Sequence, residues 1–172
     1  MEVAVTVSLG VAAQSVALIA FGLDSVVEVF ASVVVVWQLR GHRVGRERTN
    51  RSLRLVALAF FLLAAFLLVG AVEALVSERR PDNSPVGIAY LALTAAVMFT
   101  LSWRKRVVST DVDSHALVHE ARITFLDGVL ATSVLLALVA NAALDWWWAD
   151  PVAAILVAAA AVVEGINAPR EH

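Results

Sequence analysis

The sequence contains no cysteine, a single lysine and few charges, and each shortage excludes a class of protein. Without cysteine there is no disulfide framework and no thiolate metal site. Charged residues make up 16% and hydrophobic residues 60% of the 172 residues, whereas soluble domains average about 25% charged and about 45–50% apolar. No Gly-rich phosphate loop or Ser-His-Asp arrangement stands out, so we expect no enzyme. The composition predicts an integral membrane protein.

Apolar runs between clusters of charge divide the chain into six predicted helices. A helix needs about 20 apolar residues to cross the ~30 Å hydrocarbon core of a bilayer. The predicted helices cover residues 2–13, 16–39, 53–76, 86–103, 114–143 and 151–166. The first is short, as though residues before Met1 were missing, and it lacks the basic n-region of a signal peptide. We predict an all-α, six-helix transmembrane bundle that forms one domain over residues 1–172.

The positions of the basic residues predict how the helices are oriented. Six arginines lie between the second and third predicted helices and three basic residues between the fourth and fifth, against only Arg79 and Arg80 on the other side. Because Lys and Arg gather in cytoplasmic loops, both termini are predicted to be cytoplasmic. Abundant Ala, Val and Arg with a single Lys, Lys105, favour the cytoplasmic membrane of a bacterium with a GC-rich genome. We interpret the arginines as a topology signal that contacts lipid headgroups, and we expect no nucleic-acid partner.

Three carboxylates lie toward the middle of the predicted helices, although each ionised acid costs ~2.5–3.5 kcal/mol at mid-bilayer. Asp24 and Glu28 are four residues apart on the helix over 16–39 and therefore share a face. Asp127 lies near the middle of the helix over 114–143, which runs in the opposite direction, so the three acids can meet at one depth. Their repulsion would be relieved by protons or by a divalent cation. The pattern predicts a cation–proton exchanger; the alternative is that the acids only hydrogen-bond neighbouring backbone.

Three segments carry a resemblance to a known family. "SVALIAFGLDSVVEVFAS" (15–32) resembles the second transmembrane helix of the cation diffusion facilitators, which are metal/proton antiporters. "HEARITFLD" (119–127) resembles the ligand-bearing part of that family's fifth helix, and "WWWADPVAAILVA" (146–158) the start of its sixth. The resemblance implies a metal site on Asp24, Glu28 and Asp127, a homodimer, and Zn²⁺ as the first cargo, with Mn²⁺ or Fe²⁺ next.

The chain departs from the family pattern in three ways. Glu28 stands where the family usually has Asp, and Ile123 stands where a ligand His is expected; Thr124 beside it could offer a hydroxyl if the helix were rotated. The cytosolic domain that usually follows the sixth helix does not follow here. Because zinc favours N and S ligands, an all-oxygen set is less zinc-specific. A second hypothesis therefore stays open, a non-transporting relative that acts as a membrane interaction or assembly protein.

The other polar residues receive weaker interpretations. His119, on the cytoplasmic side of Asp127 and on its face, is a candidate entry ligand, although titrating interfacial histidines are commoner. Glu73 and Glu164 lie near the ends of predicted helices and are given no role. The Ala-rich helix over 151–166 is predicted to pack closely, since small residues let backbones approach.

Overall fold

The computed structural model describes residues 2–39, 46–111 and 115–167, which form helices and contain no strand. The six helices are α1 (Glu2–Ala12), α2 (Val16–Leu39), α3 (Arg46–Val76), α4 (Pro85–Asp111), α5 (His115–Leu144) and α6 (Ala149–Asn167). The prediction of an all-helical bundle is confirmed. The helix positions also agree with the sequence, except that α3 and α4 extend seven or eight residues further into their charged ends.

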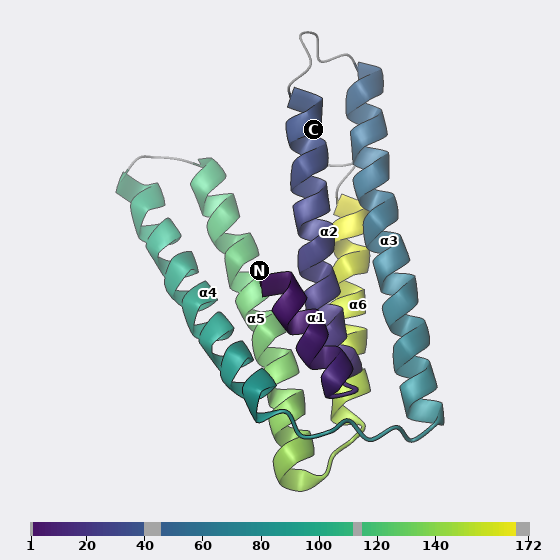
Figure 1. Cartoon of the computed structure of the whole chain (residues 1–172). Coiled ribbons are helices and arrows are strands. Elements are labelled where there is room, and N and C mark those ends of the chain that lie inside the picture. Colours follow the sequence, from purple (N-terminus) through teal and green to yellow (C-terminus); the bar gives the residue numbers. More distant parts are fainter. Residues whose placement is uncertain (1, 40–45, 112–114, 168–172) are drawn as a thin grey trace.

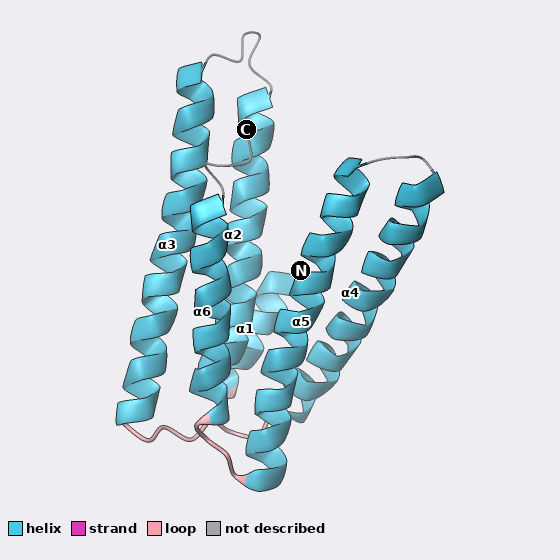
Figure 2. Ribbon diagram, turned by 180° about the vertical axis from the view of Figure 1, so that it is seen from behind, coloured by secondary structure: helices cyan, strands magenta, loops and turns pink. Residues whose placement is uncertain are grey.

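The helices form two groups that meet along α5. Figure 1 shows α2, α3 and α6 side by side, with α4 and α5 as a pair that leans away from them at its upper end. The view from behind shows the same two groups (Figure 2). Helix α6 contacts α2, α3 and α5, while α4 packs mainly on α5 and also contacts α1. Helix α5 contacts both α2 and α6 and therefore joins the two groups.

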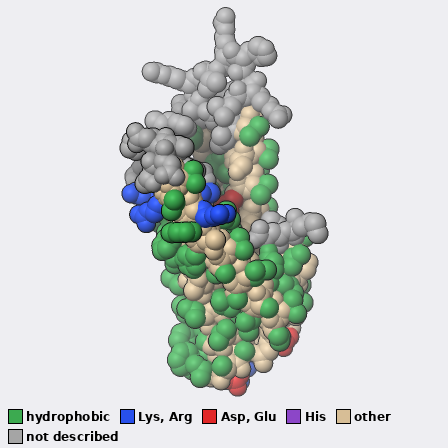
Figure 3. Space-filling view, turned by 90° about the vertical axis from the view of Figure 1, so that its left-hand side faces the viewer, with side chains coloured by type: hydrophobic (Ala, Val, Ile, Leu, Met, Phe, Trp, Pro, Cys, Tyr) green, Lys and Arg blue, Asp and Glu red, His purple; other side chains and the backbone are tan. Residues whose placement is uncertain are grey.

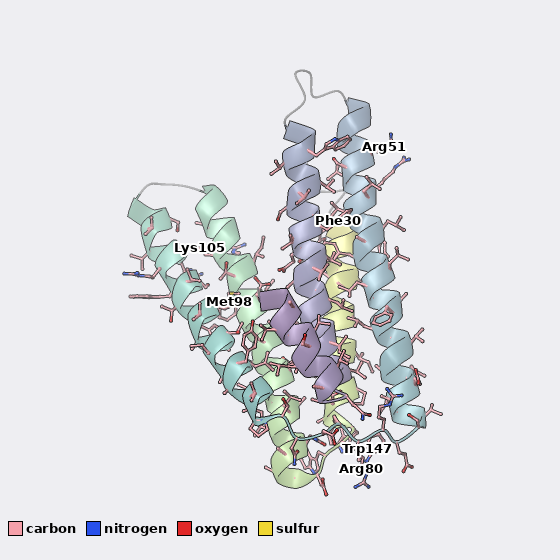
Figure 4. All side chains as sticks on the ribbon, viewed as in Figure 1. Phe30, Arg51, Arg80, Met98, Lys105 and Trp147 are labelled. Atoms are coloured by element: carbon pink, nitrogen blue, oxygen red, sulfur yellow. The ribbon has the colours of Figure 1, made fainter. Side chains whose placement is uncertain are left out.

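The bundle has two chemically different ends. Arg51 and Lys105 lie toward the end where α2 and α4 finish, and Arg80 and Trp147 lie at the opposite end (Figure 4). We call these the basic end and the tryptophan end. At the latter, the rings of Trp146 and Trp148 stack with centroids 5.3 Å apart, which suits aromatic side chains at a membrane–water interface.

The basic clusters lie largely on helices, which corrects their prediction as loop residues. Four of the arginines fall within α3 and the basic triplet within α4: Arg46, Arg48, Arg51, Arg54, Arg104, Lys105 and Arg106. Both helices continue beyond the hydrocarbon core because a helix satisfies its own backbone in water as well as in lipid. Arg40 and Arg43 lie outside the described residues.

Five of the described helices, α2 to α6, are long and apolar enough to cross a membrane. Only 28–44% of their apolar windows is buried inside the protein, so much of the apolar surface faces outward, as lipid requires. Figure 3 shows hydrophobic side chains over most of one such face, with Lys and Arg gathered toward the basic end. Helix α1 has 11 residues, about 16 Å of helix, or half of the hydrocarbon core.

A buried polar cluster at the tryptophan end fixes α2 against α6. Ser15 is the N-cap of α2: its Oγ accepts the Leu18 N–H (3.0 Å) and donates to Asp150 Oδ1. Asp150 Oδ2 accepts the N–H groups of Val16 (2.8 Å) and Ala17 (3.3 Å). The first turns of α2 and α6 therefore lie at the same level, and from there both helices run toward the basic end (Figure 1).

Small side chains let α6 occupy the centre of its group. Five alanine and valine residues of α6 are at most 3% exposed: Ala153, Ala154, Val157, Ala158 and Ala161. Their burial agrees with the close packing predicted from the Ala-rich sequence. Gly165 continues this contact, since a Cβ there would meet the ring of Phe61 at 3.3 Å and the backbone oxygen of Ala57 at 3.4 Å.

Candidate transport site

The structure brings acids of α2 and α5 within electrostatic range of each other. Asp24 lies two turns into α2, and the charge of Asp127 on α5 acts on its carboxyl group. Helices α2 and α5 contact each other, and Phe21 of α2 and Val134 of α5 are both part of the buried core. Two carboxylates on contacting helices are thus within electrostatic range inside an apolar bundle, an arrangement in which a bound cation or a proton relieves their repulsion.

Asp24 is the most deeply buried acid in the region where α2 meets α5. The residue is 9% exposed. Within the described ranges its carboxylate receives no hydrogen bond and forms no ion pair. Buried polar groups almost always have a partner, which makes this carboxylate a candidate for binding a proton or a cation.

Glu28 lies one turn further along the same face of α2 and is exposed. In the part of the chain that the structure describes, no three His, Cys, Asp or Glu side chains come close enough to hold one ion. Glu28 follows Asp24 along α2 and lies on the basic-end side of it. A coordination sphere that uses all three acids needs α2 and α5 to approach each other at this level.

Exposure rises along both facing helix surfaces toward the basic end. On α2, Phe21 is 5% exposed and Asp24 9%, whereas Glu28 is exposed. On α5, Val134 is 0% exposed, Asp127 is half-buried and Ile123 is 37% exposed. The exposed fraction of the residues on these two helices thus rises from the tryptophan end toward the basic end.

The two further candidate ligands have different outcomes. Thr124 is 7% exposed and its Oγ1 accepts a hydrogen bond from Lys105 Nζ on α4 (2.9 Å). The hydroxyl thus faces α4 and an ammonium group, which would repel a cation, so we do not carry Thr124 forward as a ligand. The side chain of His119 lies outside the described residues. Ile123 lies one turn before Asp127 on the same face, which is where a ligand on α5 would be placed.

Glu164 of α6 is a further acid within electrostatic range of Asp24, for which the sequence predicted no role. Its charge acts on Asp24, together with that of Asp127. Glu164 follows the buried residues Val157 and Ala161 at helical spacings of seven and three, so it lies on their face of α6. This helical spacing could have indicated that Glu164 lies on the buried face of α6. Its position near the end of a predicted helix instead suggested that it had no special role.

A groove on the outer surface is unrelated to these acids. It has a volume of about 480 Å³ and lies between α1 and α4. Its lining consists of Val5, Tyr90, Leu93, Thr94, Val97, Met98 and Leu101. None of these lining residues is an acid or a histidine, so the groove lacks the side chains that usually hold a cation.

A bundle of membrane-crossing helices with acids between them defines a class of protein, the membrane transporters that move ions. The cation efflux transmembrane domain matches residues 3–171, and the chain belongs to this family. It is 29% identical to the cation-efflux pump FieF of Shewanella oneidensis over 78% of this chain and 48% of the relative. It is 26% identical to an uncharacterized transporter of Synechocystis sp. over 91% of this chain and 54% of the relative. The chain thus spans about half the length of the curated relatives it matches, and its family consists of transporters, not enzymes.

Proposed function

We propose that the protein exports a divalent metal cation from the cytoplasm in exchange for protons, with Asp24, Glu28 and Asp127 as the transport site. The observation that carries the proposal is the buried carboxylate of Asp24, which has no hydrogen-bonding partner among the described residues and is acted on by the charge of Asp127. Membership of the cation efflux family supports the same class of cargo.

The exchange follows from the electrostatics of the pair. Carboxylates that lie together in a low-dielectric interior cannot all remain charged and empty, so they bind either protons or a cation. Protons arriving from outside would displace the metal, and metal arriving from the cytoplasm would displace the protons. Alternating access requires that the acids face one side at a time, and the graded exposure of α2 and α5 corresponds to access from the basic end.

The cargo is proposed from the donor atoms. Oxygen-only sites suit Mn²⁺ and similar hard ions, whereas zinc prefers sites with imidazole or thiolate ligands. Ile123 removes the nitrogen ligand that the family resemblance implies. We place Zn²⁺ first, on the strength of that resemblance, with Mn²⁺ or Fe²⁺ next.

The orientation and assembly are part of the proposal. We assign the basic end to the cytoplasm of a bacterium, because Arg and Lys gather there, and we infer a homodimer from the family resemblance. The absence of cysteine makes a direct test simple. With single cysteines at exposed Asn83 and exposed Arg104, an impermeant maleimide added outside intact cells should label only Asn83→Cys. Labelling of only Arg104→Cys would reverse the assignment.

The experiment on function is metal uptake into vesicles that contain the purified protein, driven by an imposed proton gradient. Zn²⁺, Mn²⁺ and Fe²⁺ are compared, and the double variant Asp24→Ala, Asp127→Ala should abolish uptake. Glu73→Gln is the control, because Glu73 is an exposed acid paired with Arg79 (3.2 Å) at the far end of α3. Uptake by the double variant equal to that of the unmodified protein would remove the site.

A second function, that of a non-transporting assembly protein, is favoured by one observation. Among the described residues no three potential ligands lie close enough to hold an ion, and Ile123 occupies the position of a ligand. On this hypothesis neither the unmodified protein nor the double variant moves metal under any gradient. The same vesicle experiment therefore separates the two functions.

A further inference from the structure

We propose that Glu164 is a functional residue of the transport pathway, a carboxylate from α6 that attracts the divalent cation on the basic-end side of Asp24. The inference rests on the proposed function and adds a third helix to the site. It concerns a residue to which neither the family resemblance nor the spacing of the acids on α2 and α5 gives a role.

The depth of Glu164 follows from the polar cluster at the tryptophan end. Because Asp150 accepts the N–H of Val16, α2 and α6 start at one level. Asp24 is eight residues from Val16, about 12 Å along α2, and Glu164 is fourteen residues from Asp150, about 21 Å along α6. Since the two helices run in the same direction and contact each other, Glu164 lies about 9 Å nearer the basic end.

The direction of the side chain reduces that separation. Helical side chains tilt toward the N-terminus of their helix, which for α6 is the direction of Asp24. A glutamate also reaches one methylene further than an aspartate. Consistent with this geometry, the charge of Glu164 acts on the Asp24 carboxyl group.

The surroundings of Asp24 indicate a cation rather than a structural cluster. Its carboxylate is nine-tenths buried and has no hydrogen bond or ion pair with any described residue. It is acted on by two further acids, Asp127 from α5 and Glu164 from α6. Three like charges, one of them on a buried carboxylate that lacks a donor, destabilise the protein unless a positive ligand is present.

The position of Glu164 also matches the direction of access. Glu28 and Ile123 are exposed at the basic-end side of the acids, whereas Phe21 and Val134 close the other side. Glu164 is half-buried on that same open side. A cation that enters from the basic end therefore meets the charge of Glu164 before it reaches Asp24.

The test measures the KM and maximal rate of Mn²⁺ and Zn²⁺ uptake by vesicles that contain Glu164→Gln. If the tilt and reach of the side chains bring the Glu164 carboxylate to about 9 Å from the bound ion, Coulomb's law gives about a fivefold loss of affinity at the dielectric constant of water. We expect KM to rise at least fivefold. Glu164→Asp, which keeps the charge, should stay within twofold, and Glu73→Gln, which removes an exposed acid at the other end, should not change KM.

Two additional measurements keep the proposal falsifiable. Mn²⁺ binding to the purified protein in detergent, measured by electron paramagnetic resonance, should weaken by the same factor without any transport. Glu164→Ala should repeat the loss if the glutamine variant folds poorly. If both neutral variants bind and transport as the unmodified protein does while Asp24→Asn is inactive, the role of Glu164 is refuted and the transport site stands. If Asp24→Asn is itself fully active, the proposed function fails, and the role of Glu164 fails with it.

Discussion

Replacing Asp150 by alanine should release the start of α2 from α6. The Asp150 carboxylate is 1% exposed and accepts three hydrogen bonds, from Ser15 Oγ and from the backbone N–H groups of Val16 and Ala17. At about 1 kcal/mol for each bond, Asp150→Ala should lower the free energy of unfolding by about 3 kcal/mol. This loss of stability is large for a single substitution because the hydrogen-bond donors left without an acceptor lie in apolar surroundings.

Two more conservative substitutions in the same cluster should destabilise the protein less than Asp150→Ala does. In Asp150→Asn, the new side-chain amide could still accept from the backbone with its oxygen and donate to Ser15, whose hydroxyl can rotate. This variant therefore loses mainly the favourable charge at the N-terminus of α2, about 1 kcal/mol. Ser15→Ala removes the N-cap, also about 1 kcal/mol. Alanine at position 150 should thus be clearly the most destabilising of the three.

The assay is reversible unfolding in mixed detergent micelles, followed by the fluorescence of the tryptophans at the same end of the bundle. Asp82→Asn is the matched control, because Asp82 is an exposed acid at that end and its substitution should change stability by less than about 0.5 kcal/mol. If Asp150→Ala is no more destabilising than Asp150→Asn, the hydrogen bonds do not hold α2 to α6 as described.

Two further predictions concern glycine packing and metal choice. Gly10→Ala should destabilise the protein by about 1–3 kcal/mol, because a Cβ at Gly10 would lie 2.7 Å from the backbone nitrogen of Ile19. Gly70→Ala should be neutral or stabilising by up to about 1 kcal/mol, since its Cβ would meet only Val16 Cγ1 at 3.5 Å. Thermal unfolding in detergent compares the stabilities of the two variants. An equal loss of stability from both would contradict the close approach of Gly10 on α1 to Ile19 on α2. Ile123→His should raise zinc affinity at least tenfold in calorimetric titrations, because the new imidazole lies one turn from Asp127. The control Ile123→Ala should leave zinc affinity unchanged. If the histidine variant binds zinc no better than the unmodified protein, the metal site lies elsewhere.

The helices and most of their ends, though not the charged ends of α3 and α4, could be predicted from the sequence because they depend on local chemistry. An apolar run long enough for a bilayer must be helical in lipid, since no other single segment satisfies its own backbone there. The start of α4 is similarly local: Pro85 is the first helical residue, and Ser84 Oγ accepts the N–H of Gly87 (3.1 Å). The acids of α2 and α5 could be proposed as partners because their depths follow from counting residues along opposite helices.

The side that each helix turns toward its neighbours could not be predicted in this way. In a soluble helix the polar side identifies the surface, but a helix in lipid is apolar on its outer side as well as its inner side. Helical spacing places Glu164 on the buried face of α6, but nothing in the sequence indicates that Thr124 faces Lys105 on α4 or that α6 brings Glu164 into range of Asp24. Both facts depend on how far one helix is rotated against its neighbour.

The sequence alone identifies a membrane protein, its helices and the acids inside them, because burial in lipid and the cost of buried charge are properties of single segments. Which further acid lies near Asp24, and how exposure changes along α2 and α5, was decided only by the tertiary structure. Those two properties depend on the rotation and lean of α5 and α6 relative to α2, which result from packing between small side chains far apart in the chain.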